Sequence, residues 1–232
     1  MIEVRPFRSL GRLDIDWLAA RHHFSFGHYN DPQRMGVGAL RVWNDDTIRP
    51  GSGFDPHPHR DMEIITYVRK GAITHRDKLG NEGRTEAGDV QVMSAGTGIV
   101  HAEYNLEDEP TQIFQIWIVP SATGLAPRWE ARKFPKGDRA GELVVLASGR
   151  PGDDDTLAIN QDAAVLGATI PAGQAVTHRL GAGRKAYLVA STGSITVNGE
   201  PAAARDGVVV SGEDAIEIRA VEEAEIVLVD VP

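Results

Sequence analysis

The chain has 232 residues, of which 41% are hydrophobic and 25% charged, and a formal net charge of −9 at pH 7. This length suffices for one large domain or two small ones with buried cores. The negative charge argues against direct binding to nucleic acid or to an anionic membrane surface. The sequence contains no cysteine, which excludes disulfides, thiolate metal ligands and thiol nucleophiles.

Short strands separated by turns are predicted along the first half of the chain. An ordered loop is expected near residues 21–38, where aromatic residues and histidines gather before a proline. The strands predicted after it are Leu40–Trp43, Met62–Val68, Ala72–His75, Val90–Met93 and Ile113–Val119. Strands of this length, with turn residues at intervals of about eight to twelve positions, are typical of an all-β sandwich or barrel.

Residues 120–141 are predicted to connect two domains, because they contain prolines, glycines and several charges. A helical turn is expected over Arg128 to Lys133, and strand signals resume at Leu143 to Leu146. No apolar run approaches the length of about 18 residues that a transmembrane helix needs, and the N-terminus lacks the apolar segment of a signal peptide. The expected location is therefore the cytoplasm.

The second half of the sequence weakly repeats the first. Gly71-Ala-Ile-Thr74 resembles Gly193-Ser-Ile-Thr196, and the segment 89–96 resembles 206–212 in the same order. Two related β-barrels in one chain are the simplest interpretation. We place the boundary between residues 130 and 131, which gives domains 1–130 and 131–232.

Two pairs of potential metal ligands lie in the first half. His57 and His59 are two residues apart, so both imidazoles point to the same face of an extended strand. Pro58 between them cannot donate a ladder hydrogen bond, which places the pair at a strand start or on an edge strand. His101 and Glu103 repeat this spacing. Three imidazoles and one carboxylate could therefore converge on one divalent metal.

The internal repeat provides a control for this hypothesis. The second half has His178-Arg-Leu180 where the first has His57-Pro-His59, and it has no histidine after Gly212. The second half keeps the strand and turn pattern without the ligand set, so the fold does not require these histidines. We interpret His178 as the remnant of a lost ligand and expect the metal site in the first half alone.

Two motifs resemble those of the cupin superfamily. They are Gly51-x5-His57-x-His59-x3-Glu63-x7-Gly71 and Gly96-x-Gly98-x2-His101-x3-Asn105. The glycine of the first motif comes one residue late, and Gly96 stands where the second motif usually has proline. From about residue 20 to 130 the chain resembles the pirin family, a bicupin branch, in the blocks His23-Phe-Ser-Phe, Asn44-Asp-Asp, His57-Pro-His-Arg-Asp-Met-Glu-Ile and Met93-Ser-Ala-Gly-Thr-Gly-Ile-Val-His-Ala-Glu-Tyr-Asn.

This resemblance implies an all-β bicupin with two double-stranded β-helix (jelly-roll) barrels. The N-terminal one would bind metal, and the C-terminal one would be a degenerate cupin without metal ligands. The resemblance assigns the ligands to His57, His59, His101 and Glu103, and it argues that Glu63 is not a ligand. We expect one divalent transition metal, iron first, with nickel, copper, manganese, cobalt or zinc as alternatives, since these ligands accept several ions.

Bacterial pirins of this type are implicated in quercetin 2,3-dioxygenase activity. The implied function is the cleavage of a flavonol by O2 with release of carbon monoxide, and the expected partners are a flavonol-like substrate and dioxygen. Glu103 could also be the base that accepts the proton of the substrate's 3-hydroxyl. The alternative is a metal-dependent, redox-sensing regulatory protein that acts through contacts with a protein partner. An enzyme needs a pocket for the flavonol beside the metal, whereas a switch needs only a buried metal near an interface.

Several other residues have roles that the sequence leaves open. His75 could line the pocket or lie on the surface, and Glu63 could point to the other side of its strand or bond to a metal ligand. The residues considered for the pocket wall are Phe24, Phe26, His28 and Met93. No motif identifies a residue that reads the hydroxyl groups of a substrate.

Overall fold

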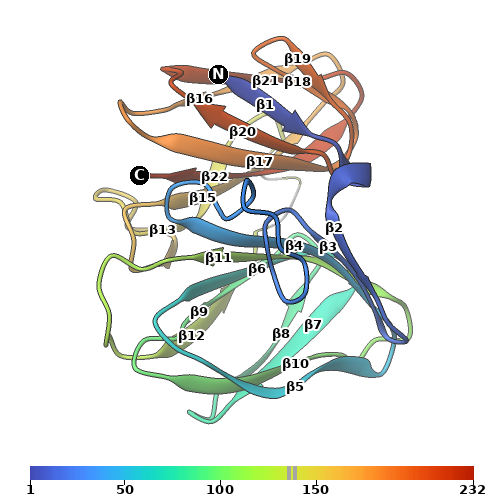
Figure 1. Ribbon diagram of the computed structural model, residues 1–232, viewed down its shortest axis with the longest axis vertical. Coiled ribbons are helices and arrows are strands. Elements are labelled where there is room, and N and C mark those ends of the chain that lie inside the picture. The colour runs from blue at the N-terminus through green and yellow to red at the C-terminus, as the bar shows by residue number, and fades with distance from the viewer. Residues whose placement is uncertain (135–136, 138–139) are drawn as a thin grey trace.

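The computed structural model describes residues 1–134, 137 and 140–232 (Figure 1). Within these residues the chain is built mainly of strands, as predicted, and a short 3-10 helix, η1 (Phe7–Ser9), follows the first of them. The strands of the first half are β1 (Ile2–Arg5), β2 (Gly11–Asp14), β3 (Leu18–His22), β4 (Leu40–Ile48), β5 (Ser52–His59), β6 (Glu63–Lys70), β7 (Ala72–Asp77), β8 (Glu82–Glu86), β9 (Val90–Ser94), β10 (Ile99–Asn105), β11 (Thr111–Ile118) and β12 (Arg128–Arg132). Those of the second half are β13 (Val144–Ser148), β14 (Leu157–Ala158), β15 (Ala164–Ile170), β16 (Ala175–Arg179), β17 (Lys185–Thr192), β18 (Ile195–Val197), β19 (Glu200–Ala202), β20 (Gly207–Ser211), β21 (Ala215–Ala220) and β22 (Ala224–Val231). Among the described residues no helix has the length and apolar character needed to cross a membrane.

Each half of the chain contributes a seven-stranded and a four-stranded sheet. In the first half the strand orders are β12-β9-β6-β11-β4-β3-β2 and β5-β10-β7-β8. In the second half they are β1-β20-β17-β22-β15-β13-β14 and β16-β21-β18-β19. The sheets face each other without closing into continuous barrels. The predicted all-β, two-unit architecture is confirmed, and each unit is a jelly-roll-like sandwich.

The four sheets stack in layers, with the two seven-stranded sheets in the middle (Figure 1). Because side chains alternate along a strand, each central sheet turns one face toward the other half and one toward its own small sheet. Trp43, Tyr67 and Phe114 of the first half meet Tyr187 and Val229 of the second in one buried apolar cluster. A separate buried cluster fills the interior of the second sandwich.

The N-terminal strand of the chain belongs to the sheet of the other half, across the predicted domain boundary. β1 pairs with β20, so the N-terminal strand completes the central sheet of the second half. In the first half the matching edge position is taken by β12, which pairs with β9. The helical turn predicted over Arg128 to Lys133 is therefore wrong, because this segment is held extended by the ladder to β9. The division at residue 130 stays a prediction; of the expected connection 120–141, residues 135–136 and 138–139 lie outside the described residues.

A buried ion network also joins the two halves. Asp45 is fully buried on the face of β4 that turns toward the second half, and it contacts both Arg69 and Arg205. The Nε atom of Arg205 lies 2.6 Å from Asp45 Oδ2. The hydroxyl of Tyr67 donates a hydrogen bond to Glu225 across the same interface. These contacts fix the two central sheets against each other.

We predict that Asp45→Ala lowers the free energy of unfolding by about 3–5 kcal/mol, because it leaves two guanidinium groups without their shared buried carboxylate. Urea denaturation monitored by circular dichroism measures the change. The control is Asp16→Ala: Asp16 is 94% exposed and pairs with Arg49 at the surface, so its loss should cost less than about 1 kcal/mol. Equal effects of the two substitutions would contradict a structural role for the network.

Candidate metal centre

The histidine pair lies on an edge strand, as the proline between them predicts. β5 forms the edge of its four-stranded sheet next to β10. The register places His57 opposite His101, and His59 opposite Ile99. A β-bulge in β10 separates His101 from Glu103, and such bulges change the direction in which side chains point. Pro58 is exposed on the outer side of the strand, where its missing N–H leaves no acceptor unsatisfied.

The three histidines converge between the two sheets of the first half. Their potential ligand nitrogens all lie within 4.8 Å of one another. The Nε2 atoms of His57 and His101 are 3.1 Å apart, and the His59 ring lies 4.7 Å from that of His57 and 5.0 Å from that of His101. Burial lowers the pKa of His59 to about 4 and that of His101 to about 2. Both rings are therefore neutral at pH 7, which is the form that binds metals.

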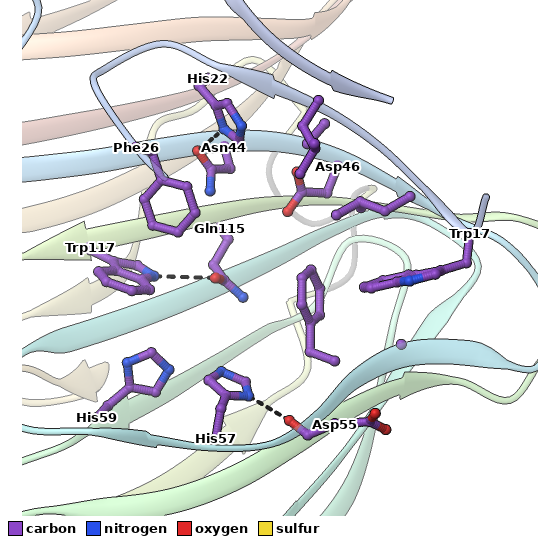
Figure 2. Close-up of a pocket in the computed structure, with 15 residues that line it drawn as sticks. Trp17, His22, Phe26, Asn44, Asp46, Asp55, His57, His59, Gln115 and Trp117 are labelled. Carbon is purple, nitrogen blue, oxygen red and sulfur yellow. Dashed lines mark hydrogen bonds between the residues drawn. The ribbon is translucent and has the colours of Figure 1, made fainter. Parts of the chain in front are cut away.

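The hydrogen bond of His57 fixes which of its nitrogens carries the proton. Its Nδ1 atom lies 2.7 Å from the backbone carbonyl oxygen of Asp55. A carbonyl oxygen can only accept, so Nδ1 must be the donor, and Nε2 is then the nitrogen of His57 that can offer a lone pair to a metal. That lone pair points toward His101 (Figure 2 shows the Nδ1 contact).

A chain of hydrogen bonds assigns His101 in the same way. Asp77 is a carboxylate whose pKa is kept below its usual value by hydrogen bonds that outweigh its burial. It lies 3.0 Å from Nε2 of His75 and so accepts a proton from that nitrogen. Nδ1 of His75 is then an acceptor for Nδ1–H of His101, 3.3 Å away, which leaves the lone pair of His101 on Nε2. The His75 ring, fully buried, stacks on Trp129 at 4.8 Å, so the prediction of a surface position is excluded.

Two lone pairs therefore face each other at the centre of the cluster. Without a proton between them, His57 and His101 repel each other unless a cation lies between them. Their 3.1 Å separation agrees with two nitrogens that are each about 2.0–2.1 Å from one metal. The donor set and its fixed tautomers thus fit a divalent transition metal, with the outer nitrogens held by a carbonyl and by the Asp77–His75 pair.

Glu103 lies deeper than the histidines and is only 1% exposed. Its carboxylate accepts hydrogen bonds from Gln91 at 2.6 Å, Gln115 at 2.8 Å and Thr66 at 3.2 Å. Burial raises the pKa of Glu103 to about 7 in spite of these three donors. The carboxylate is thus held in one orientation.

The position of Glu103 relative to the cluster differs from that of the three histidines. Its oxygen belongs to a second group of potential ligand atoms, shared with His75 and His101, which overlaps the first group at His101. The structure thus brings together His57, His59 and His101 and places Glu103 beside them. The assignment of Glu103 as fourth ligand and as base stays a prediction.

A cavity of about 470 Å³ opens onto His57 and His59 (Figure 2). Aromatic pairs form its sides: Trp17 meets Phe54 edge to face at 5.1 Å, and Phe26 meets Trp117 at 5.4 Å. The polar residues that line it are His22, Asn44, Asp46 and Gln115, together with Asp55 at the rim.

Of the residues predicted to line this pocket, only Phe26 does so within the described structure. Phe24 belongs to the core between the halves, Met93 is buried between the sheets of the first half, and His28 is exposed. Alternation along β11 could have identified Trp117, which lies two residues after Gln115 and so shares its face. Trp17 and Phe54 carry no signal in the sequence, since distant segments bring them together.

The remaining predicted residues lie outside the cluster. Glu63 turns to the other face of β6, where it accepts hydrogen bonds from Ser94 at 2.6 Å and Asn160 at 3.0 Å. His178 is buried, and its Nε2 lies 2.8 Å from Asp230. Asp230 also pairs with Arg184, so this histidine has a structural hydrogen-bond partner of its own.

The interior of the first half contains a row of polar side chains that the second half lacks. The two central sheets have the same strand order and can be aligned strand by strand. The alignment is fixed by a β-bulge that both sheets have just before a turn, at Gly71 after β6 and at Gly193 after β17. Cross-strand neighbours on the inner face of the first half are Gln91, Thr66, Gln115, Asn44 and His22. At the matching positions the second half has Val208, Leu188, Leu228, Leu166 and Val145. The polar row is thus specific to the half that holds the histidines.

Comparisons with known proteins agree with this architecture. The family model described as Pirin matches residues 3–118, and that described as Quercetinase C-terminal cupin domain matches residues 145–231. A pirin-like protein of Caulobacter vibrioides is 61% identical over 230 residues, or 99% of each chain. The quercetin 2,3-dioxygenase of Escherichia coli K12 is 40% identical over 233 residues, covering 100% of this chain and 99% of the relative. The crystal structure of the bacterial pirin YhhW of Escherichia coli in complex with nickel(II) superposes with a TM-score of 0.93 at 39% identity, covering 100% of this chain and 99% of that one. The chain therefore belongs to the pirin family of bicupins.

Proposed function

We propose that this chain is a metal-dependent dioxygenase that cleaves a flavonol with O2 and releases carbon monoxide. The observation that carries the proposal is the cavity of about 470 Å³ whose aromatic walls end at His57 and His59. This volume lies within the range of about 300–1,000 Å³ that is common for small-molecule sites. The name of the Escherichia coli relative, quercetin 2,3-dioxygenase, supports the same activity.

The cavity favours the enzyme over the regulatory alternative. A redox switch needs a buried metal close to a protein-binding surface, and it gains nothing from an adjoining chamber. Here Trp17, Phe54, Phe26 and Trp117 enclose a space beside the histidines, which suits a flat aromatic ligand. No feature of the described residues identifies a surface for a protein partner.

The proposed metal ligands are His57, His59 and His101, with Glu103 as the fourth. A divalent transition metal held there would supply Lewis acidity and access to redox chemistry with dioxygen. Iron is the ion to test first, and the nickel complex of the related structure makes nickel the second. The chain's own contribution is to hold the donor atoms in one arrangement and to keep water away from the substrate with aromatic walls.

The proposed proton acceptor is Glu103. Its task is to take the proton of the substrate's 3-hydroxyl onto a carboxylate oxygen, so that the substrate binds as an anion. Gln115 lies between Glu103 and the cavity: it donates to the Glu103 carboxylate at 2.8 Å and accepts from the Trp117 indole at 3.2 Å. Gln115 is thus the cavity residue that contacts the proposed base directly.

The test is quercetin turnover under oxygen by protein purified without oxygen and reconstituted with one metal at a time. We expect wild type to consume quercetin and release carbon monoxide, and Glu103→Gln to be at least about 100-fold slower, since a general base contributes about 10²–10⁴. Turnover at the wild-type rate by the Gln variant would exclude the base. Failure of the wild type with every metal would exclude the dioxygenase itself.

Metal content gives an independent test of the ligand set. We expect His101→Ala to lose most of its bound metal, measured by inductively coupled plasma mass spectrometry after dialysis, because one of the converging nitrogens is removed. The matched control is His178→Ala, which removes a buried histidine from the corresponding strand of the second half and should leave the metal content unchanged. Equal loss in both variants would mean that the metal responds to stability alone.

The Asp77–His75 pair should affect metal affinity without binding the metal. We expect His75→Phe to weaken affinity by about 10–100-fold, as is typical when the hydrogen-bonding partner of a metal-binding histidine is removed. Phenylalanine keeps the stack on Trp129, so the loss reports the hydrogen bond; competition with a chromophoric chelator measures it. His28→Phe, which changes an exposed histidine, is the control. Unchanged affinity in His75→Phe would show that His101 needs no support from Asp77.

A further inference from the structure

Asp46 is a buried acid whose side chain the metal centre does not use. It is 2% exposed, lines the cavity and points into it from the wall opposite His57 and His59 (Figure 2). Among the described residues its Oδ1 atom has no hydrogen-bond partner. Buried polar atoms without partners are costly and uncommon in folded proteins. Asp46 thus has hydrogen-bonding capacity that its protein neighbours do not use, on a side chain that lines the cavity.

The charge state of Asp46 follows from its surroundings. Burial, together with the nearby carboxylates of Asp45 and Glu103, raises the pKa of Asp46 well above its usual value, and Arg69 only partly offsets this. These surroundings favour the neutral carboxylic acid, which can donate one hydrogen bond through its O–H and accept others. Its neighbour Asp45 turns to the other face of β4 and is held by two arginines.

Asn44 adds a second polar group to the same wall. It lies two residues before Asp46 on β4, so both side chains share one face of the strand. Its amide oxygen is held by Nδ1 of His22 at 2.8 Å, which leaves the amide nitrogen turned toward the cavity (Figure 2). The wall thus offers two hydrogen-bond donors and one acceptor to whatever occupies the cavity.

The fold does not require these polar groups. Asp46 pairs with Ile113, and the corresponding pair in the second half is Ala168 with Ile226. The position of Asn44 is taken there by Leu166. The second half is well packed with these apolar residues. We therefore attribute the acid Asp46 and the amide Asn44 on this wall to a function of the first half, and not to the needs of the fold.

We propose that Asp46 and Asn44 bind a hydroxyl-bearing edge of the aromatic substrate and thereby select polyhydroxylated flavonols over less hydroxylated ones. The inference rests on the proposed function in one respect, that the ligand is a flavonol. The Asn44 N–H and the Asp46 O–H donate to substrate oxygens, and the free Asp46 oxygen accepts from a substrate hydroxyl. The aromatic walls hold the ring between this pair and the histidines. A site of this kind rejects ligands that lack the hydroxyl, because its buried polar groups are then left unpaired.

The test is ligand binding to metal-loaded protein without oxygen, so that no turnover occurs. The two ligands are quercetin and 3-hydroxyflavone, which keeps the 3-hydroxyl and 4-carbonyl groups and lacks the other ring hydroxyls. We expect wild type to prefer quercetin, and Asp46→Ala, which installs the residue of the second half, to lose about 10–100-fold of affinity for quercetin alone. Asp46→Asn keeps a neutral donor and acceptor and should retain the preference within about threefold. Fluorescence quenching gives the dissociation constants.

Three controls make the outcome decisive. Asp16→Ala removes a carboxylate that is 94% exposed next to the cavity residue Trp17, and it should change neither affinity. Metal content and urea unfolding of each variant confirm that it is folded and loaded. A preference for quercetin that survives Asp46→Ala would overturn the proposal. Equal losses of quercetin affinity in the Ala and Asn variants would also overturn it, because recognition would then require an ionised carboxylate. Normal discrimination in binding without turnover under oxygen would instead refute the dioxygenase and leave this recognition site standing.

Discussion

The alternation of side chains along the strands of the two central sheets is the constraint on which the rest of this structure depends. Both faces of each seven-stranded sheet are buried, one against the other half and one within its own sandwich. A shift of one residue along β4 would exchange the ion-paired Asp45 with the cavity-facing Asp46. The register of β4 therefore determines both the ion pairs between the two halves and the residues that line the cavity. Stability and recognition depend on adjacent residues that point in opposite directions.

In the candidate metal centre, hydrogen bonds to the outer nitrogens of the histidines determine which nitrogens are available to bind a metal. The Asp55 carbonyl and the Asp77–His75 pair each take up the outer nitrogen of one histidine, and in doing so they leave the lone pairs of His57 and His101 facing inward. Three side-chain donors likewise hold Glu103 in one orientation. These contacts hold the donor atoms of the site in fixed orientations. The second half lacks this arrangement: Ile216 lies opposite His178, where His101 lies opposite His57.

The comparison of the two halves separates what the fold needs from what the site needs. The second half fills its inner face with Val208, Leu188, Leu228 and Leu166 and buries them completely or nearly so. The first half has polar residues at the same positions and leaves a cavity of about 470 Å³ beside the histidines. Apolar packing at these positions is the more stabilising choice. The first half thus has less apolar packing on this face, and it has instead the polar groups and the open space that a binding site requires.

The sequence by itself determined the fold class, the internal repeat and the edge-strand position of the histidine pair, because these depend on local periodicity and on the missing N–H of Pro58. It also indicated the four candidate ligands, since a spacing of two puts side chains on one face of a strand. It misjudged the segment from Arg128, which is extended as far as Arg132 because β9 supplies its hydrogen bonds, and of the cavity wall it identified only Phe26. Asn44 and Asp46 were read as part of a turn after the predicted strand Leu40–Trp43, which is wrong because β4 continues to Ile48 along its ladder to β11. Only the tertiary structure decided that both residues line the cavity and that Asp46 Oδ1 has no partner, because these facts depend on strand register and on contacts between segments far apart in the chain.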